Sequence, residues 1–593
     1  MADIDNRIKR LRDKMINLGL DAYIIPSSDP HLSEYVPPRW EGRKWASGFT
    51  GSAGTLVLTR KESGLWTDGR YHIQAENQLQ GSGIRLFKAG LEGVISYPDW
   101  LANNLDEGNV VGVFGQLFSV SDIKRLENKL ARKKIKLNKQ YDLLEGIWDD
   151  RPDIPLNPIY NHDIAYAGKS TAEKISEIRR EMNKKGVNYY LVPSLDDVAW
   201  LFNIRGSDVE YNPVALAYGL VSQDSAWLFI DPRKINEEVK ETLYSNGVII
   251  EGYEQIKDRL ANLGKEDAIL YDPQRTNYWL YESINPGCKK VEDMSLCALA
   301  KAVKNHREIQ GIRECHVRDG VAMVKFLYWL DENLGKQEIT ELTVAEKLEY
   351  FRSQQKDFMG PSFSTIAAYK DNAAMMHYQA TQEKYYVLKR EGMLLIDSGG
   401  QYLDGTTDIT RTIILGPITD EERRDYTLTL KGNINLAKAK FLNEATGSNL
   451  DILARLPLWE YGIDYKCGTG HGVGYFLSVH EGPQRISQVP NNIKLRSGMV
   501  ITNEPGVYRE GKYGIRIENE LLVVEDQKTE SGQFLKFDVL TLCPIDLEGV
   551  DVQLLSLEEK HWLNRYHKLV YDTLSPFLTD EEKEWLKKET RAI

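Results

Sequence analysis

Two stretches of the chain share one pattern of hydrophobic and polar positions. The segment RIKRLRDKMINLGLDAYIIPSS, from Arg7, recurs as KISEIRREMNKKGVNYYLVPSL, from Lys174. In each copy an apolar stripe at helical spacing runs to a glycine, Gly19 or Gly186, that suits the C-terminal cap of a helix. A short apolar run ending at a proline follows and predicts a buried strand. Because LVLTRKESGLWTDGR also corresponds to YGLVSQDSAWLFIDPR, the pattern predicts a duplicated α/β domain.

The repeat divides the chain into three regions. We expect the first α/β domain over residues 1–160, with a proline-bearing linker from Arg151, and the second over residues 161–302. The third region, residues 303–593, begins with a long amphipathic helix from His306 and ends with a capped helix from Ser556. His316 lies on the apolar face of the first of these helices and is predicted to be a packed core residue.

Composition and charge narrow the class of protein. A chain of 593 residues, 42% of them hydrophobic, is too long for a single core. Its net charge of −12 gives no overall attraction for nucleic acid or anionic membranes, so neither is expected as a partner. The sequence has no transmembrane-length apolar run and a charged N-terminus, which predicts a cytoplasmic protein. Five cysteines without a CxxC pair argue against disulfides and a structural zinc site.

Acidic residues stand at the margins of apolar, strand-like runs in the third region. Asp397 ends one such run and Asp408 opens the next alternating segment, so an antiparallel pair of strands would bring them together. Asp404, between them, is expected to be only a turn residue. An unpaired carboxylate is costly to bury, and Asp397 and Asp408 therefore need a cation.

A second pair of acids follows the same pattern. Glu504 comes directly after an apolar run, and Glu518 lies in YGIRIENELLVVE on the same strand face as Arg516, which is consistent with a second hairpin. His471 lies between the two hairpins in a glycine-rich run. Four carboxylates and one histidine suit two divalent cations that share oxygens, manganese rather than zinc. Surface turns and ion pairs are the alternative interpretation of the same acids.

Together these motifs resemble the five-ligand pattern of the pita-bread metallopeptidases. The pattern is carried by the motifs DITRT, GHGVG, EPG and GIRIEN. The likeness extends toward the long, three-domain Xaa-Pro aminopeptidases through the segment EYVPPRWEGRKWASGFTGSAGTLVLT. The resemblance implies two related creatinase-like α/β domains followed by a pita-bread catalytic domain. It also implies two divalent metal ions, most often manganese, bound by Asp397, Asp408, His471, Glu504 and Glu518.

The same resemblance implies roles around the metals. Glu504 would act as general base, and His377 and His480 would line the substrate site and donate hydrogen bonds during catalysis. Arg70 and Arg516 are the other substrate-binding residues expected.

The implied activity is release of the N-terminal residue from peptides that have proline in second position, by a protein that is commonly a homodimer. One residue departs from the family pattern, because Cys467 stands where relatives often have histidine, which puts one substrate-side hydrogen bond in doubt. A prolidase, which cleaves Xaa-Pro dipeptides, is the nearest alternative, and its usual chain is shorter. A non-catalytic pita-bread peptide-binding module is the alternative outside the enzymes, although such proteins typically lack the ligands.

Overall fold

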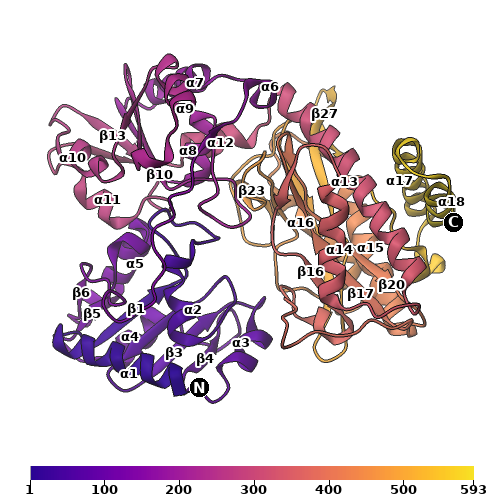
Figure 1. Cartoon of the computed structure of the whole chain (residues 1–593), viewed down its shortest axis with the longest axis horizontal. Helices are drawn as coiled ribbons and strands as arrows, with labels where there is room; N and C mark the ends of the chain where they lie inside the picture. Colours follow the sequence, from indigo (N-terminus) through magenta and orange to yellow (C-terminus); the bar gives the residue numbers. More distant parts are fainter. Residues whose placement is uncertain (1) are drawn as a thin grey trace. The chain divides into compact units, whose positions relative to one another are not determined.

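The computed structural model describes residues 2–593 and divides into two compact units (Figure 1). Unit 1 contains the chain up to Ile164 together with Lys169–Leu299. Unit 2 contains Ala165–Gly168 and Ala300–Ile593. The acids and histidines singled out above all belong to unit 2, whereas Arg70 belongs to unit 1.

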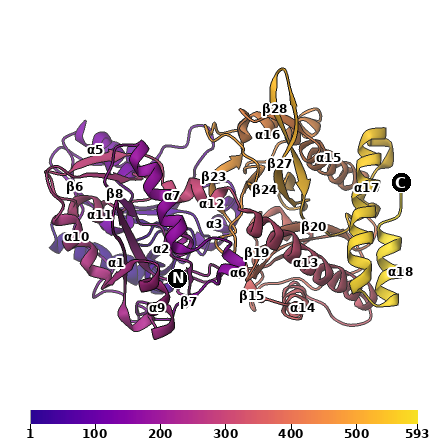
Figure 2. The same ribbon diagram turned by 90° about the horizontal axis from the view of Figure 1, so that it is seen from above.

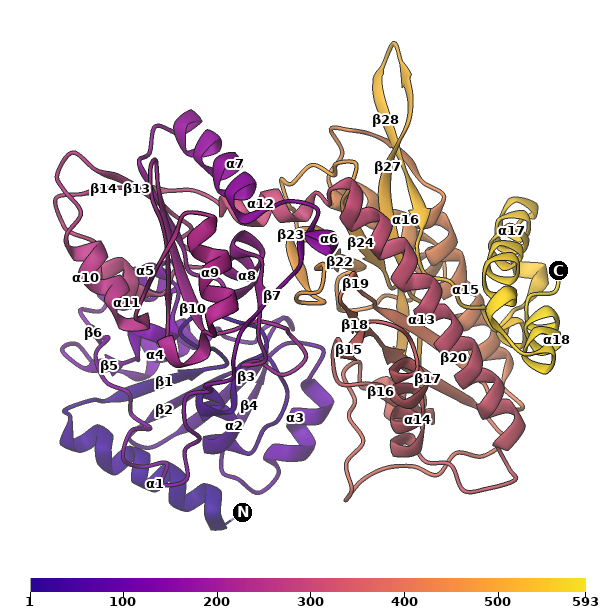
Figure 3. The same ribbon diagram turned by 45° about the horizontal axis from the view of Figure 1, so that its top comes forward.

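The first half of unit 1 is a six-stranded mixed sheet with helices packed on it. Its strand order is β4-β3-β2-β1-β5-β6. The strands are β1 (Ala22–Pro26), β2 (Thr55–Thr59), β3 (Ser63–Thr67), β4 (Arg85–Lys88), β5 (Val110–Gly112) and β6 (Lys136–Asn138), and the main helices are α1 (Ala2–Asn17), α2 (Gly42–Ser47), α3 (His72–Leu79), α4 (Tyr97–Asn104) and α5 (Val120–Ala131). Figure 3 shows α1 running along the outside of this sheet.

The second half of unit 1 repeats this topology. Its sheet has the order β12-β11-β10-β8-β13-β14, in which each strand takes the place of its counterpart in the first sheet. The strands are β8 (Tyr189–Val192), β10 (Ala217–Ser222), β11 (Ala226–Ile230), β12 (Val248–Glu251), β13 (Ala268–Tyr271) and β14 (Lys289–Glu292), and the helices are α7 (Thr171–Lys184), α8 (Leu195–Phe202), α9 (Glu237–Ser245), α10 (Ile256–Ala261) and α11 (Tyr278–Ser283). In both halves the central strand pairs antiparallel on one side and parallel on the other. The predicted duplication is therefore confirmed.

The glycines that end the two repeated helices behave as predicted. Gly19 and Gly186 have φ angles of 69° and 64°, in the left-handed region that an L side chain rarely adopts.

Helix α12 (Leu296–Ala302) leads from unit 1 into unit 2.

Unit 2 is an α+β structure of antiparallel sheets covered by helices. The sheets have the orders β16-β17-β20, β15-β18-β19, β25-β26 and β21-β28-β27-β24-β22-β23. The strands are β15 (Phe358–Pro361), β16 (Ile366–Tyr369), β17 (Met393–Ser398), β18 (Gly400–Tyr402), β19 (Gly405–Thr406), β20 (Ile409–Ile414), β21 (Lys440–Leu442), β22 (Gly470–Gly472), β23 (Glu481–Ile486), β24 (Val500–Asn503), β25 (Gly506–Arg509), β26 (Tyr513–Arg516), β27 (Asn519–Thr529) and β28 (Gly532–Val539). Figures 2 and 3 show the β27–β28 hairpin extending beyond the rest of its sheet.

Long helices bury the outer faces of these sheets. They are α13 (His306–Asn333), α14 (Glu341–Ser353), α15 (Asp420–Ala437) and α16 (Gly447–Trp459), followed by α17 (Leu557–Leu574) and α18 (Asp580–Glu589). Phe326 of α13 packs in one core cluster with Leu394 and Ile396 of β17. Helix α15 likewise packs Leu430 against Ile515. Alternation places Leu395 and Asp397 on the opposite face of β17, where Leu395 joins a further apolar cluster.

The C-terminal helices complete this unit. Ser556 and Glu559 form the capping box that begins α17, as the sequence predicts. Tyr566 and Val570 are buried in the core of unit 2, whereas Leu569 is 47% exposed. Among the described residues, no helix combines the length and apolar character needed to cross a membrane.

Candidate metal centre

Two antiparallel strands bring the first pair of acids together. Strand β17 pairs with β20 so that Asp397 stands opposite Thr410, and Asp408 lies directly before β20. Both carboxylates are buried, at 8% and 4% exposure. The prediction of an antiparallel pair is confirmed. Asp404 lies in the turn between β18 and β19 as expected, but it is also buried and forms an ion pair with Arg318.

The second pair of acids lies where β24 and β27 meet. Asn503 of β24 pairs with Asn519 of β27, which places Glu504 and Glu518 just beyond the ladder. The backbone N–H of Glu518 donates to the carbonyl of Thr410 at 3.0 Å, and the Thr410 hydroxyl donates to the Glu518 carboxylate at 2.7 Å. These bonds join the two pairs of acids into one site.

His471 completes the set from β22, the strand between β23 and β24. Its Nδ1 lies 2.9 Å from the carbonyl oxygen of Gly472, which selects the tautomer that leaves Nε2 free to bind a metal. Nε2 is 3.5 Å from a carboxylate oxygen of Asp408 and 3.5 Å from one of Glu504. A Cβ at the preceding Gly470 would lie 1.9 Å from the carbonyl oxygen of Thr502, so this close strand packing requires glycine.

Potential ligand atoms gather in three overlapping groups. Within each group the atoms lie within 4.8 Å of one another; the groups are Asp397–Asp408–Glu518, His471–Glu504–Glu518 and Asp408–His471–His480. Shared members connect the groups, so the donors are arranged for neighbouring cations. Carboxylate and imidazole donors are the ligands that divalent first-row metals take in proteins.

The electrostatics of the acids also fit a cation. Burial, with repulsion from Asp408 and Glu504, raises the pKa of Asp397 to about 6. Burial and repulsion from Asp408 raise the pKa of Glu518 well above its ordinary value. Burial disfavours protonation of His471, but Asp408 and Glu504 outweigh it and raise its pKa to about 9. A buried set of acids that repel one another is stabilised by bound positive charge.

Arg516 supports Asp397 from behind. Its guanidinium is 3% exposed, forms an ion pair with one Asp397 oxygen, and donates to the Tyr508 hydroxyl at 2.6 Å. The other oxygen, Oδ1 of Asp397, is buried without a hydrogen-bond partner and is therefore available to a metal. Tyr508 was not found by sequence reasoning, because nothing in GVYR links a tyrosine to the acids on other strands.

A second support lies behind Asp408. The Asp408 backbone N–H donates to the Glu520 carboxylate at 2.6 Å, and Nε2 of His316 lies 3.4 Å from the same carboxylate oxygen of Glu520. His316 is buried, as predicted, and its ring faces the Glu520 carboxylate. Its position as a lone histidine on an apolar helix face was the only signal in the sequence.

The other residues that the sequence analysis singled out are not among the five candidate metal ligands. His480 is half-buried, and its ring lies 4.4 Å from that of His471 in an edge-on arrangement. His377 is half-buried beside Met376, whose carbonyl lies 3.4 Å from Arg516. Cys467 is half-buried. Arg70, in unit 1, forms a bidentate pair with Asp68.

Family models match the chain from end to end. One model of the creatinase/prolidase N-terminal domain matches residues 7–144, and a second model of that domain matches residues 150–308. Metallopeptidase family M24 matches residues 310–525, and the C-terminal region of that peptidase matches residues 533–593. The four matches follow the same order as the α/β repeat and the α+β unit.

Similar proteins share the whole length of the chain. Aminopeptidase P1 of Lotus japonicus is 38% identical over 100% of both chains, and a probable Xaa-Pro aminopeptidase P of Paracoccidioides brasiliensis is 40% identical over 100% of this chain and 99% of its own. The X-prolyl aminopeptidase structure from Caenorhabditis elegans, described as a cytosolic enzyme with a di-nuclear active site, has a TM-score of 0.96 and 36% identity, with 100% of each chain covered. A Bacillus anthracis Xaa-Pro dipeptidase shares the fold over 64% of this chain and 99% of its own, with a TM-score of 0.51 and 23% identity. The chain therefore belongs to the Xaa-Pro aminopeptidases of metallopeptidase family M24, built of two creatinase-type α/β domains and a pita-bread domain.

Proposed function

We propose that this protein is a dinuclear metallo-aminopeptidase that removes the N-terminal residue from peptides with proline in second position. The observation that carries the proposal is the convergence of Asp397, Asp408, His471, Glu504 and Glu518 from five segments on one buried site. Full-length similarity to Xaa-Pro aminopeptidases supports the same activity, whereas the dipeptidase covers only part of the chain.

The five residues suit two ions in distinct roles. Asp397 would bind one ion, His471 and Glu504 the other, and Asp408 and Glu518 would bridge both. When bound, the metal pair would supply a water of lowered pKa and polarise the scissile carbonyl. The network from Arg516 and Tyr508 would hold the Asp397 carboxylate in place through its Oδ2 oxygen.

The protein's own side chains would handle protons and orient the substrate. Glu504, 22% exposed at the edge of the acid set, would take the proton of the attacking water and pass it to the departing proline nitrogen. His480 and His377 would donate hydrogen bonds to the substrate carbonyl as negative charge develops on its oxygen. The proline nitrogen carries no N–H in an Xaa-Pro bond, so the pocket has no donor to satisfy there.

Further assignments rest on the same proposal. The carboxylate-rich donor set favours manganese as the metal. A homodimer is supported by the exposed Leu557 and Leu569 on α17, which could meet a second copy. A cytoplasmic location is supported by the cytosolic relative. Sedimentation of only a 67.8 kDa species at micromolar concentration would remove the dimer from the proposal.

The activity is tested by three substrates. The manganese-loaded protein is incubated with an Xaa-Pro-Yaa tripeptide, the Xaa-Pro dipeptide and an Xaa-Ala-Yaa tripeptide, and the released residue is measured. Cleavage of the first alone supports the proposal. Cleavage of the dipeptide alone would make the protein a prolidase, and cleavage of none with metal bound would indicate a binding role.

A further inference from the structure

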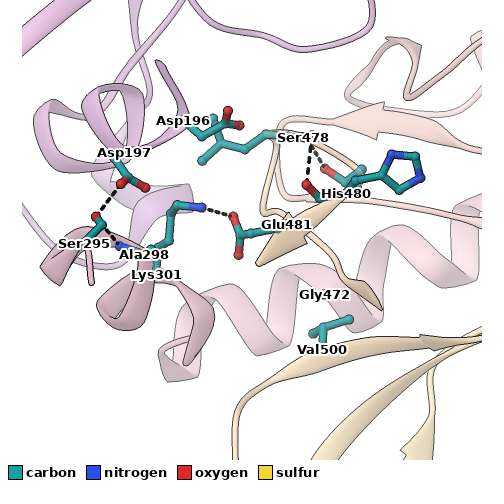
Figure 4. Close-up of polar contacts among 12 residues, drawn as sticks. Asp196, Asp197, Ser295, Ala298, Lys301, Gly472, Ser478, His480, Glu481 and Val500 are labelled. Atoms are coloured by element: carbon teal, nitrogen blue, oxygen red, sulfur yellow. Dashed lines mark hydrogen bonds and ion pairs between the residues drawn. The ribbon is translucent and has the colours of Figure 1, made fainter. Parts of the chain in front are cut away.

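A buried ionic cluster adjoins the candidate metal centre without belonging to it. Glu481 is flanked by Lys301, whose Nζ lies 2.9 Å from Oε2, and by Lys304, whose Nζ lies 2.6 Å from Oε1. All three side chains are at most 3% exposed. Figure 4 shows Lys301 reaching the Glu481 carboxylate, with His480 next along the chain.

The cluster is costly and so requires an explanation. One carboxylate faces two ammonium groups in the interior, and buried ion pairs of this kind add little stability compared with apolar packing. Burial alone would raise the pKa of Glu481, but the two lysines outweigh it and hold this pKa below its ordinary value. Glu481 is therefore ionised, and each of its two carboxylate oxygens contacts one lysine.

The backbone of Glu481 links the cluster to the two histidines of the site. Glu481 pairs with Gly472, the residue after His471, and a Cβ at Gly472 would lie 2.3 Å from the Glu481 carbonyl oxygen. His480 directly precedes Glu481, and its carbonyl accepts a hydrogen bond from the Ser478 hydroxyl at 3.3 Å. The His480 backbone is therefore held on one side by Ser478 and on the other by the anchored Glu481.

The two lysines are themselves fixed by the catalytic sheet. Lys301 lies in the last turn of α12, and the Lys304 backbone N–H donates to the carbonyl of Gly498 at 2.9 Å. Val303, between them, bridges Met499 at the start of the segment that enters β24. This short stretch of chain thus connects the Glu481 carboxylate with the strand that leads to Glu504.

We propose that Lys301 and Lys304 are positioning residues that hold His480 toward the substrate by anchoring Glu481. This inference rests on the proposed function for the role of His480. Neither lysine belongs to the groups of candidate metal ligands, so the proposed effect on the site passes through Glu481 and its neighbour.

The test is a double-mutant cycle with Lys301→Met and His480→Ala in the full-length, manganese-loaded protein. Lys301→Met leaves Glu481 neutralised by Lys304, so the protein folds and keeps its metal content. We expect kcat for an Xaa-Pro-Yaa tripeptide to fall about tenfold with KM little changed, the scale typical of supports behind site residues. In the His480→Ala background, Lys301→Met should cause no further loss.

Two further variants give the cycle its controls. Lys301→Arg keeps the charge and should restore most of the lost turnover. Lys431→Met removes a partly buried lysine of α15 that lies 2.8 Å from Glu559 of α17, and it should leave turnover unchanged. Glu481→Gln should lose turnover more severely, because it removes the charged carboxylate that both lysines contact.

A crystal structure of Lys301→Met separates this inference from the proposed function. A displaced or disordered His480 imidazole is expected. Additive losses in the cycle, or His480 unmoved in the variant, would overturn the positioning role even in an active peptidase. A displaced His480 in a protein that cleaves none of the peptides would keep the positioning role and refute the proposed function.

Discussion

At the residue scale, the sequence predicted which candidate ligands lie close together, but it did not predict the residues that support them. The five candidate ligands lie in short motifs whose residue types and spacing already point to cations. Glu520 and Lys301 contact residues from distant segments, and Tyr508 reaches Asp397 only through Arg516. No local pattern records these pairings. Glu520 could have been suspected, because alternation places it on the same strand face as Glu518.

Glu504→Gln is expected to fold normally and lose nearly all turnover. The amide keeps the size of the side chain but cannot accept the proton of the attacking water. Circular dichroism and the rate of cleavage of an Xaa-Pro-Yaa tripeptide provide the measurement. Turnover close to wild type would remove Glu504 from the mechanism.

Asp408→Ala is expected to lower the metal content toward zero. The Asp408 carboxylate belongs to two of the three groups of ligand atoms, so its loss should weaken the binding of both metal ions. Metal per chain is measured by mass spectrometry after dialysis, with Glu525→Ala, an acid of the β27–β28 hairpin, as control. Two ions retained by the Asp408 variant would show that this residue is not a bridge.

At the element scale, strand pairing was the more predictable part of the site. Asp397 ends one apolar run and Asp408 opens the next alternating segment, and this pattern predicted the β17–β20 pair correctly. Each of the two segments is long enough to form a buried strand. A second hairpin was expected from the spacing of Glu504 and Glu518, and the β25–β26 hairpin lies between these two acids. It consists of Gly506–Arg509 and Tyr513–Arg516.

Gly470→Ala is expected to separate β22 from β24. The new Cβ would lie 1.9 Å from the Thr502 carbonyl oxygen, so the strand must shift and carry His471 with it. We expect a loss of about 1–3 kcal/mol in stability and a loss of about tenfold or more in manganese affinity. Thermal unfolding and calorimetric titration measure these two effects.

Gly468→Ala is the matched control for this substitution. A Cβ there would meet its nearest atom, the Ile486 carbonyl oxygen, at 3.5 Å, an ordinary contact. If both alanine variants bind manganese equally well, close packing at Gly470 does not position His471.

At the scale of the whole molecule, the repeat was the strongest prediction. Two sheets with the same strand order follow from one duplicated pattern of helix, glycine and buried strand. The sheets of unit 2 were harder to derive, since one of them joins strands that are far apart in sequence, with β21 paired to β28 and β24 to β22 and β27. Resemblance to a family supplied that architecture, and periodicity alone did not.

Manganese is expected to raise the unfolding temperature of the protein. A ligand that binds only the folded state stabilises it by about 2.7 kcal/mol at one hundred times its dissociation constant. Calorimetry with and without manganese should show an upward shift of several degrees, and the Asp408→Ala variant should show almost none. An unchanged transition in the wild-type protein at metal concentrations that saturate turnover would contradict a metal site in the folded core.

The central claim is that the five residues hold two metal ions that are needed to cleave an Xaa-Pro bond. Its most direct test is titration of the metal-free protein with manganese while release of the first residue from an Xaa-Pro-Yaa tripeptide is followed. We predict no turnover without metal and a maximum at two ions per chain. Full turnover in the presence of a chelator, or a maximum at one ion per chain, would contradict the account.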